Sequence, residues 1–267
     1  MNDEFDAKAY WEKRLMGKYD LSGVGWESLG RPYNRWIYWA KKKIFRRLAG
    51  PLCDSSSELS VLDIGSGTGF YIERWKELGV PAISGCDITA IAVEKLRERF
   101  PEIQFEQLDI AGDIAKCGIA STKYDIVSSF DVLYHIVDDD SFERAVSNIS
   151  NLMKPEGLFF LTDYFFRFRG FRSEHVVGRT LKDYKAVIEK NGFEILERRP
   201  ASILCFPPSD VKSRLSPTLW YIATFPMRIV PALGYIYGLL FAPVDVLLTK
   251  ILKEGPGLEF MVCKKRA

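Results

Sequence analysis

Glycine stands at every second position of one short loop, and this spacing favours a nucleotide-like ligand. The segment V-L-D-I-G-S-G-T-G-F, residues 61–70, places Gly65, Gly67 and Gly69 directly after four residues typical of a buried strand. Without β-carbons the backbone can turn sharply through positive φ, and a ligand can lie against its amide groups. A helix over residues 70–78 would aim its free N–H groups and positive dipole end at that ligand.

Acidic residues stand at the expected carboxyl ends of the first three strands. Asp63 lies within the first strand, Asp87 ends a second strand over 82–87, and Asp109 follows a third. Parallel strands of such a sheet end at one edge, so we expect all three carboxylates to serve one ligand rather than only to cap helices. Because a carboxylate can accept two hydrogen bonds at once, Asp87 suits the paired hydroxyls of a ribose.

The glycine pattern also bears on which nucleotide is bound. A dinucleotide fingerprint requires a third glycine at the position of Phe70, so an NAD-linked oxidoreductase is disfavoured and remains a rival testable by nicotinamide binding. The pattern Asp-x-Gly-x-Gly-x-Gly instead resembles motif I of the class I S-adenosylmethionine-dependent methyltransferases. The resemblance extends over residues 59–199 and the last strand. It implies S-adenosyl-L-methionine as cofactor and a small molecule as methyl acceptor.

The resemblance also implies how the cofactor is held. The amino-acid end would meet Asp63 and the Gly65 backbone, the ribose would meet Asp87, and the adenine would meet Ile88, Asp109 and the N–H of Ile110. Asp63 could equally bond loop amides and fix the turn, and both roles can hold together. Aromatic faces stabilise a sulfonium cation, and the candidates are Phe130, Tyr134 and Tyr10.

Methyl transfer is an in-line displacement that depends mainly on positioning, and a base is needed only when the acceptor must lose a proton. The two histidines of the chain are the candidate bases. His135 follows the fourth strand, and His175 lies in an arginine-rich loop after the fifth. Those arginines, Arg167, Arg169, Arg172 and Arg179, would bind a phosphate or carboxylate or form a solvated face.

Other site chemistries are not expected. The run Asp138–Asp140 points its carboxylates in different directions, and one of them should cap a helix, so we predict no metal site. Strand four carries S-S-F-D-V-L-Y-H, without the N/D-P-P-Y/F signature of enzymes that methylate the amines of bases. The net charge is only +2, so we expect no nucleic-acid partner.

The elements that position these residues alternate between strand and helix from residue 59 to 199, which predicts an α/β fold with helices on both faces of a parallel sheet. We predict a doubly wound core over residues 51–200. The last strand, within residues 257–267, breaks the alternation. The resemblance implies that it is the seventh strand of a mostly parallel sheet and runs antiparallel between strands five and six.

Residues 1–50 are predicted to form a helical cap. A helix over 6–16 with Tyr10 and Trp11 either folds over the cofactor as a lid, as the resemblance implies, or rests on the surface of the core. A second helix over 34–49 has one apolar stripe, and its lysines and arginines are expected to form a solvated face. It could alternatively lie on an anionic membrane. Gly50-Pro51 should end this helix.

Residues 201–256 form an unusually long hydrophobic insertion between strands six and seven. Its uncharged stretch, 229–244, is shorter than a bilayer requires and is broken by prolines. Three accounts stay open: a lid over the acceptor pocket, a homodimer surface, or a segment that dips into a membrane interface. We favour the lid, and we infer an apolar or lipid-like acceptor.

Five cysteines without a C-x-x-C pair indicate reduced thiols, and the acidic N-terminus lacks an apolar signal region, so we expect a cytoplasmic protein with the option of peripheral membrane contact. Taken together, these features predict a methyltransferase for a small acceptor, most simply at oxygen. The rival keeps the cofactor pocket for another reaction, such as a cyclisation, or for binding alone. Product mass separates the two, because only methyl transfer adds a methyl group.

Overall fold

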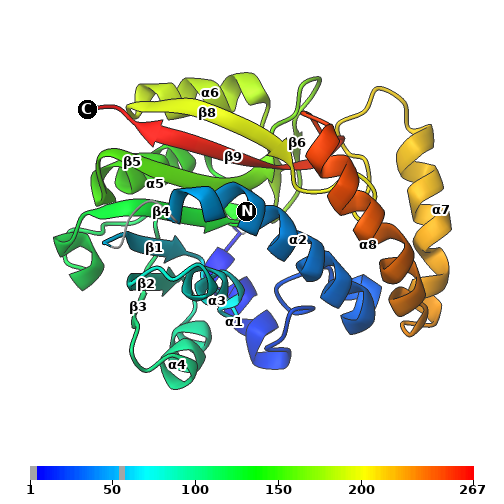
Figure 1. Cartoon of the computed structure of the whole chain (residues 1–267), viewed down its shortest axis with the longest axis horizontal. Coiled ribbons are helices and arrows are strands. Elements are labelled where there is room, and N and C mark those ends of the chain that lie inside the picture. The colour runs from blue at the N-terminus through cyan, green and yellow to red at the C-terminus, as the bar shows by residue number, and fades with distance from the viewer. Residues whose placement is uncertain (1–4, 54–57) are drawn as a thin grey trace.

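The computed structural model describes residues 5–53 and 58–267, and its centre is a seven-stranded sheet (Figure 1). The strands lie in the order β3-β2-β1-β4-β5-β9-β8, and neighbours from β3 to β5 are parallel. The strands are β1 (Ser60–Ile64), β2 (Ala82–Asp87), β3 (Gln104–Gln107), β4 (Tyr124–Phe130), β5 (Met153–Tyr164), β8 (Phe193–Pro200) and β9 (Leu258–Lys265). A separate two-stranded ribbon joins β6 (Phe171–Arg172) to β7 (Val177–Gly178).

Helices cover both faces of the sheet, which confirms the doubly wound prediction. The helices are α1 (Ala7–Gly17), α2 (Gly30–Cys53), α3 (Phe70–Glu77), α4 (Ala90–Arg99), α5 (Asp139–Leu152), α6 (Leu181–Lys190), α7 (Leu215–Ile229) and α8 (Leu233–Ile251). One face buries residues of α5 and α6, such as Ile149 and Ile188. The other buries residues of α2 and α3, such as Phe45 and Trp75. Alternate residues of each strand therefore serve two different cores.

The last strand lies inside the sheet rather than at its edge. β9 pairs antiparallel with β5 on one side and with β8 on the other. Phe260 is opposite Thr162 of β5 and Arg199 of β8. The expected antiparallel seventh strand between strands five and six is thus confirmed.

Helix α2 differs from its prediction at its end and in what it buries. It continues through Pro51 to Cys53, because a proline in the last turn removes one backbone bond and leaves the preceding turns intact. One side of α2 packs on the sheet through Phe45, and the opposite side packs on α8 through Tyr33. Lys41, which the sequence pattern assigned to a solvated face, is buried.

The insertion forms a helical hairpin, α7 and α8, that lies along α2 (Figure 1). Small residues of α8 face α2: a β-carbon on Gly238 would lie 2.1 Å from the Trp36 ring, and one on Gly234 would lie 2.9 Å from the Tyr33 backbone. Ala242 continues this stripe and is fully buried. The two helices therefore approach closely through residues spaced four apart, and the large side chains of α8 point elsewhere.

Candidate functional site

The glycine loop connects β1 to α3 and turns by means of left-handed backbone. Gly67 has φ of +53°, and Gly65 and Gly69 also have positive φ. The N–H groups of Gly65 and Ser66 donate to the carbonyl of Cys86 at 2.8 and 3.0 Å, which ties the loop to the end of β2. Gly69 is the N-cap of α3, so the loop presents the amino end of that helix at the edge of the sheet.

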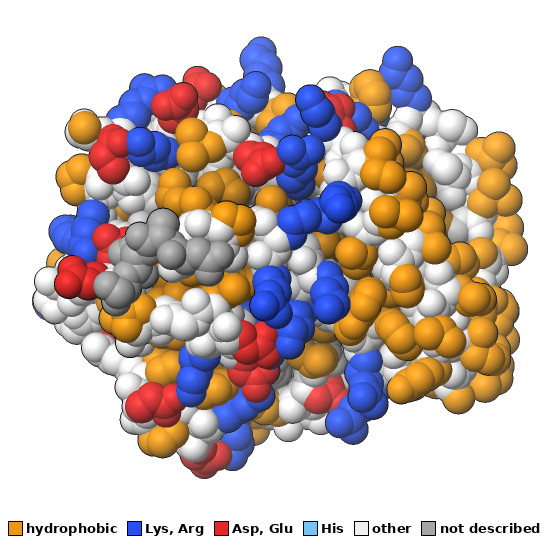
Figure 2. All heavy atoms as spheres, viewed as in Figure 1, with side chains coloured by type: hydrophobic (Ala, Val, Ile, Leu, Met, Phe, Trp, Pro, Cys, Tyr) orange, Lys and Arg blue, Asp and Glu red, His pale blue; other side chains and the backbone are white. Residues whose placement is uncertain are grey.

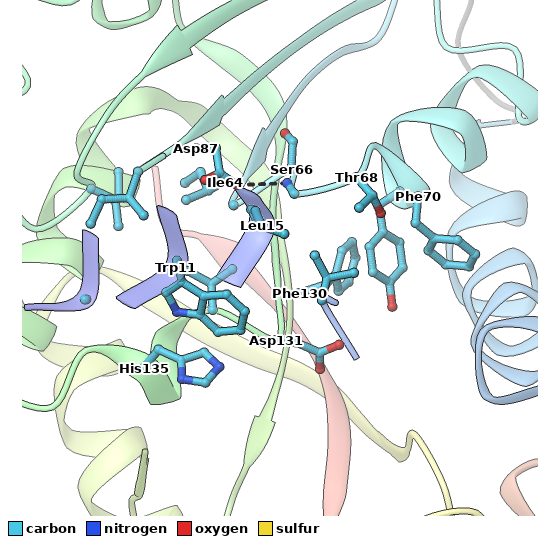
Figure 3. A pocket seen from close by; sticks show the side chains of 18 of the residues that line it. Trp11, Leu15, Ile64, Ser66, Thr68, Phe70, Asp87, Phe130, Asp131 and His135 are labelled. Atoms are coloured by element: carbon cyan, nitrogen blue, oxygen red, sulfur yellow. Dashed lines mark hydrogen bonds between the residues drawn. The ribbon is translucent and has the colours of Figure 1, made fainter. Parts of the chain in front are cut away.

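A cavity opens beside this loop, at the carboxyl ends of β1, β2 and β4 (Figure 3). Its lining residues come from the loop, the strand ends and α1: Ala7, Trp11, Leu15, Val24, Tyr38, Ile64, Gly65, Ser66, Gly67, Thr68, Phe70, Tyr71, Asp87, Ile88, Leu108, Asp109, Ile110, Phe130, Asp131, Val132, His135 and Ile136. We call it the cofactor cavity. Most residues that the sequence assigned to the cofactor lie in this one wall.

Asp87 is held in place before any ligand is bound. One carboxylate oxygen accepts the N–H of Gly67 at 2.8 Å, and the other accepts the N–H and hydroxyl of Thr89 at 2.9 and 2.7 Å. Burial raises the pKa of the Asp87 carboxyl, and these hydrogen bonds oppose that rise. The oxygen bonded to Gly67 accepts only one hydrogen bond, so it keeps a lone pair that a ribose hydroxyl could use.

Two buried hydroxyls in the cofactor cavity fit a polar ligand. The hydroxyls of Thr68 and Tyr71 have no hydrogen-bond partner among the described residues, although both side chains line the cavity. A buried hydroxyl without a partner costs free energy, and a polar ligand in the cavity can supply the missing partner. Asp109 lies at the same wall and accepts the N–H of Ala111 at 2.9 Å.

Asp63, Gly69 and Tyr10, by contrast, lie outside the residues that line the cofactor cavity. The Asp63 carboxylate is buried behind the loop and accepts the Ser128 hydroxyl at 2.6 Å, and desolvation raises its pKa to about 7. Tyr10 stacks on His175 with ring centroids 5.2 Å apart. From the same helix Trp11 reaches the cavity together with Ala7 and Leu15, and its ring meets His135 edge-on at 4.9 Å (Figure 3).

Helix α1 is attached to the core at the cavity by polar contacts. The Glu12 carboxylate accepts the N–H groups of Ala90 and Ile91 at the amino end of α4, at 2.8 and 3.0 Å. Just beyond the helix, the Tyr19 hydroxyl donates to the carbonyl of Gly67 at 2.9 Å. The N-terminal segment therefore closes one side of the cofactor cavity and is bonded to the loop itself.

A second cavity, of about 610 Å³, lies against the first. Its residues are Trp11, Arg14, Val24, Gly25, Trp26, Glu27, Ser28, Asn34, Ile37, Tyr38, Lys41, Asp131, Tyr134, His135, Tyr164, His175, Val176, Phe206 and Leu258. We call it the acceptor cavity. Tyr38, Asp131 and His135 are among the residues that line both cavities, so the two spaces share a wall. None of the lining residues of either cavity comes from α7 or α8.

Lys41 and Asp131 form an ion pair at this shared wall, and the sequence analysis assigned neither to the site. The two side chains are 6% and 17% exposed. Asp131 has φ of +62°, and its second carboxylate oxygen accepts the Thr162 hydroxyl at 2.8 Å. The one sequence feature that could have indicated Asp131 is its position directly after Phe130, at the end of β4. Lys41 lies in a basic run that gave no sign of burial.

His135 is a half-buried imidazole. Its Nδ1 lies 2.8 Å from the carbonyl oxygen of His175, which requires a proton on Nδ1 and leaves Nε2 as an acceptor. Burial lowers the pKa of His135 from 6.5 to about 4. His175 lies at the tip of the β6–β7 ribbon and lines only the acceptor cavity.

We expect His135 to remain neutral from pH 7 down to about pH 5, because its folded pKa is depressed to about 4. Stability that rests on neutral His135 is complete above the unfolded pKa of 6.5. Because the unfolded state takes up the proton first, this stability is lost progressively as the pH falls from 6.5 to about 4, by an amount on the order of 3 kcal/mol. The chain has two histidines, so an NMR titration compared with that of a His135→Gln variant identifies the signal. A His135 signal that titrates near 6.5 would contradict this expectation.

The arginine-rich loop is occupied by internal ion pairs. Arg167 bonds Asp210 at 2.6 Å, and Arg172 and Arg179 both pair with Asp139. These three arginines therefore do not form a free anion site. The neighbouring Asp138 caps α5 by accepting the N–H of Ser141, and no group of three or more potential metal ligands occurs among residues 5–53 and 58–267.

Residues 61–157 match a family model described as a methyltransferase domain. The chain is 30% identical over 131 residues to the ubiquinone biosynthesis O-methyltransferase of Brucella ovis. The aligned region covers 49% of this chain and 46% of that protein. The chain is 26% identical over 135 residues to the mRNA cap guanine-N(7) methyltransferase of Schizosaccharomyces pombe, and the aligned region covers 47% of this chain and 36% of that protein. The chain thus spans less than half the length of these relatives.

Solved structures share the architecture at low identity. The magnesium protoporphyrin IX methyltransferase from Synechocystis, crystallised with bound S-adenosylmethionine, matches with a TM-score of 0.58 and 15% identity and covers 100% of both chains. The [4+2]-cyclase SpnF matches with a TM-score of 0.51 and 16% identity, over 83% of this chain and 82% of that one. At these identities the likeness establishes the fold.

Proposed function

We propose that this chain, whose residues 61–157 match a methyltransferase domain and whose fold is shared with an S-adenosylmethionine-binding methyltransferase, transfers a methyl group to an oxygen atom of a small, apolar acceptor. The observation that carries this proposal is the wall shared by the cofactor and acceptor cavities at Tyr38, Asp131 and His135. An in-line displacement requires donor carbon and acceptor atom to be close and collinear, and two adjoining cavities provide that arrangement.

The chain supplies a binding group for each part of the cofactor. Asp87, held by the Gly67 N–H, would accept from the ribose hydroxyls, and the amino end of α3 with its glycine loop would bind the polar end of the ligand. The rings of Phe130 and Trp11 line the cavity where a cation is expected. When bound, S-adenosyl-L-methionine supplies an electrophilic methyl group on sulfur.

The acceptor cavity suits a molecule with an apolar body and a hydroxyl. Its volume of about 610 Å³ falls in the range of small-molecule sites, and Trp26, Phe206 and Tyr164 contribute aromatic walls. A hydroxyl directed at the shared wall meets the free Nε2 of His135. An alcohol oxygen that becomes methylated holds its proton only weakly, so even the weakly basic imidazole of His135 could accept that proton.

Oxygen as the acceptor atom is supported by the Brucella relative, which is named as an O-methyltransferase. A second candidate function keeps the same cofactor cavity for a reaction without methyl transfer. The fold it shares with a [4+2]-cyclase is compatible with that function. The two functions differ in the mass of the product and in the fate of the cofactor.

The test is a mass measurement with the purified protein, S-adenosyl-L-methionine and a panel of apolar hydroxylated acceptors. Methyl transfer predicts a product heavier by one methylene group and one equivalent of S-adenosylhomocysteine. Reactions without cofactor are the control. A product of unchanged mass, formed without S-adenosylhomocysteine, supports the second candidate and contradicts the first. Failure of the protein to bind the cofactor in calorimetry contradicts both.

A further inference from the structure

Exposed apolar side chains are concentrated on the α7–α8 hairpin. Nineteen large hydrophobic side chains are exposed among the described residues, and all but Met16, Phe168, Phe171 and Leu196 lie between residues 215 and 252. The fifteen are Leu215, Leu219, Tyr221, Ile222, Phe225, Ile229, Val230, Tyr235, Ile236, Leu239, Leu240, Val244, Leu247, Ile251 and Leu252. We call them the hairpin surface. A monomeric protein rarely exposes so continuous an apolar area unless it binds something.

The hairpin surface carries few charges, and its only fully exposed charge, Lys250, lies in the last turn of α8. Between Ser216 and Thr249 the charged residues are Arg228, which is half-buried, and Asp245, which is fully buried. Asp245 accepts the N–H groups of Ile203 and Leu204, both at 2.6 Å, so its charge faces the protein interior. Apart from the half-buried Arg228, the outer face of both helices is therefore apolar up to the last turn of α8.

Basic residues surround this apolar area. Lys212 and Arg214 precede α7, and Lys250 and Lys253 stand at the end of α8, all four exposed. The neighbouring α2 adds further exposed arginines and lysines, Arg31, Arg35, Lys43 and Arg46. Figure 2 shows Lys and Arg side chains gathered between the orange surface over α7 and α8 and the rest of the molecule. An apolar face bordered by cations complements an anionic bilayer surface.

Helix α8, Leu233–Ile251, is long and apolar enough to cross a membrane by length and composition, with a mean hydropathy of 1.3. Its packing argues for a different placement. Gly234 and Gly238 press against α2, and the Arg47 guanidinium donates to the Thr249 carbonyl at 3.0 Å. The helix is thus fixed along α2 over its whole length. A broad face held in this way can lie in the plane of an interface, whereas a spanning helix would have to leave its partner.

A second copy of this chain fits the surface less well than a bilayer does. A two-fold dimer apposes the same patch of both copies, so the basic residues around the hairpin surface would face one another. Like charges at the border of an interface oppose association. The same cations are attracted to anionic headgroups. Charge therefore distinguishes between the two occupants.

We propose that the hairpin surface docks this protein onto anionic membranes, with the apolar side chains of α7 and α8 in the headgroup–acyl boundary and the surrounding lysines and arginines at the phosphates. This proposal goes beyond methyl transfer and does not depend on it. The docked face comprises α7 and α8, and α8 packs on the side of α2 opposite the sheet. Docking there leaves both cavities unobstructed, since none of their lining residues comes from the hairpin.

The test is flotation of the full chain with vesicles of phosphatidylcholine alone or mixed with phosphatidylserine. We expect the wild type to float with the anionic vesicles, and less so with neutral vesicles or at high salt. A Leu239→Glu/Leu240→Glu variant should lose binding at least about tenfold, because it places charge in the apolar face. Leu196→Glu is the matched control, since Leu196 is similarly exposed on β8 and should change nothing.

A second pair of variants tests the basic border. Lys250→Glu/Lys253→Glu should weaken binding to anionic vesicles several-fold, and Lys116→Glu, on an exposed loop of the core, should not. Thermal unfolding of every variant shows whether it is folded. Wild-type protein that never floats with anionic vesicles overturns the proposal. A stable dimer in solution that is dissociated by the Leu239→Glu/Leu240→Glu change, without vesicle binding, overturns it in favour of a second copy.

Discussion

Replacing Gly67 by valine is expected to abolish S-adenosylmethionine binding while the sheet stays folded. Gly67 has φ of +53°, where a β-branched residue is strained, and the new β-carbon would lie 3.3 Å from Val24 in the wall of the cofactor cavity. The Gly67 N–H also positions Asp87. Displacement of the loop should therefore reduce affinity at least about 100-fold, equivalent to roughly 2.7 kcal/mol, as measured by calorimetry.

The matched control is Gly79→Val. Gly79 has φ of +77°, a β-carbon placed on it would have no atom within 4 Å, and it follows α3, outside the cofactor cavity. Its replacement carries the same kind of backbone strain, about 1–2 kcal/mol, without touching the ligand. Both variants should lose some thermal stability, and only Gly67→Val should lose affinity. A folded Gly67→Val protein with wild-type affinity would refute the cofactor assignment.

Removal of the Lys41 charge should destabilise the fold and stop turnover together. Lys41→Met leaves the Asp131 carboxylate without its cation at a site where the two side chains are 6% and 17% exposed. Breaking a buried pair at one partner costs about 3–5 kcal/mol, and access of water from the cavity favours the lower end of that range. Chemical denaturation measures the stability, and product formation under saturating cofactor measures the turnover.

Two further variants separate packing from charge. Lys42→Met removes the neighbouring lysine, whose ion pair with Glu77 is 34% and 43% exposed, and should change stability by less than about 1 kcal/mol. In Lys41→Met/Asp131→Asn the unpaired charge is gone, so most of the stability should return while turnover stays low. If Lys41→Met changes stability and turnover as little as Lys42→Met does, the Lys41–Asp131 pair contributes to neither, and the prediction is wrong.

Much of the core could be predicted from local sequence because each element is bounded by its own signals. One residue of the run Asp138–Asp140 was expected to cap a helix, and Asp138 accepts the Ser141 N–H at the start of α5. Val61–Ile64 was expected to be a buried strand, and it lies in β1. The position of β9 within the sheet, by contrast, could not be predicted from local sequence. No periodicity indicates which strands it will pair with, and that prediction rested on the family resemblance.

The site was predictable where it follows strand ends and unpredictable where it depends on distant partners. Asp87 and Ile88 line the cofactor cavity because they stand where β2 stops. Lys41 pairs with Asp131, 90 positions away in the sequence, and the apolar pattern of a helix does not indicate such a distant partner. Trp11 and Tyr10 are neighbours on α1, and only the rotation of the docked helix decides that Trp11 enters the cavity.

The place of β9 within the sheet governs how the nascent chain can fold. β9 separates β5 from β8, so until residues 258–265 are synthesised the Leu158–Tyr164 edge of β5 is open and β8 has no neighbour in the sheet. The apolar hairpin is made before that strand, so an open edge and an exposed apolar face coexist on the ribosome. Unpaired strand edges and apolar surface both invite aggregation. Translation is therefore the stage at which this protein most needs a chaperone or a membrane to cover the hairpin.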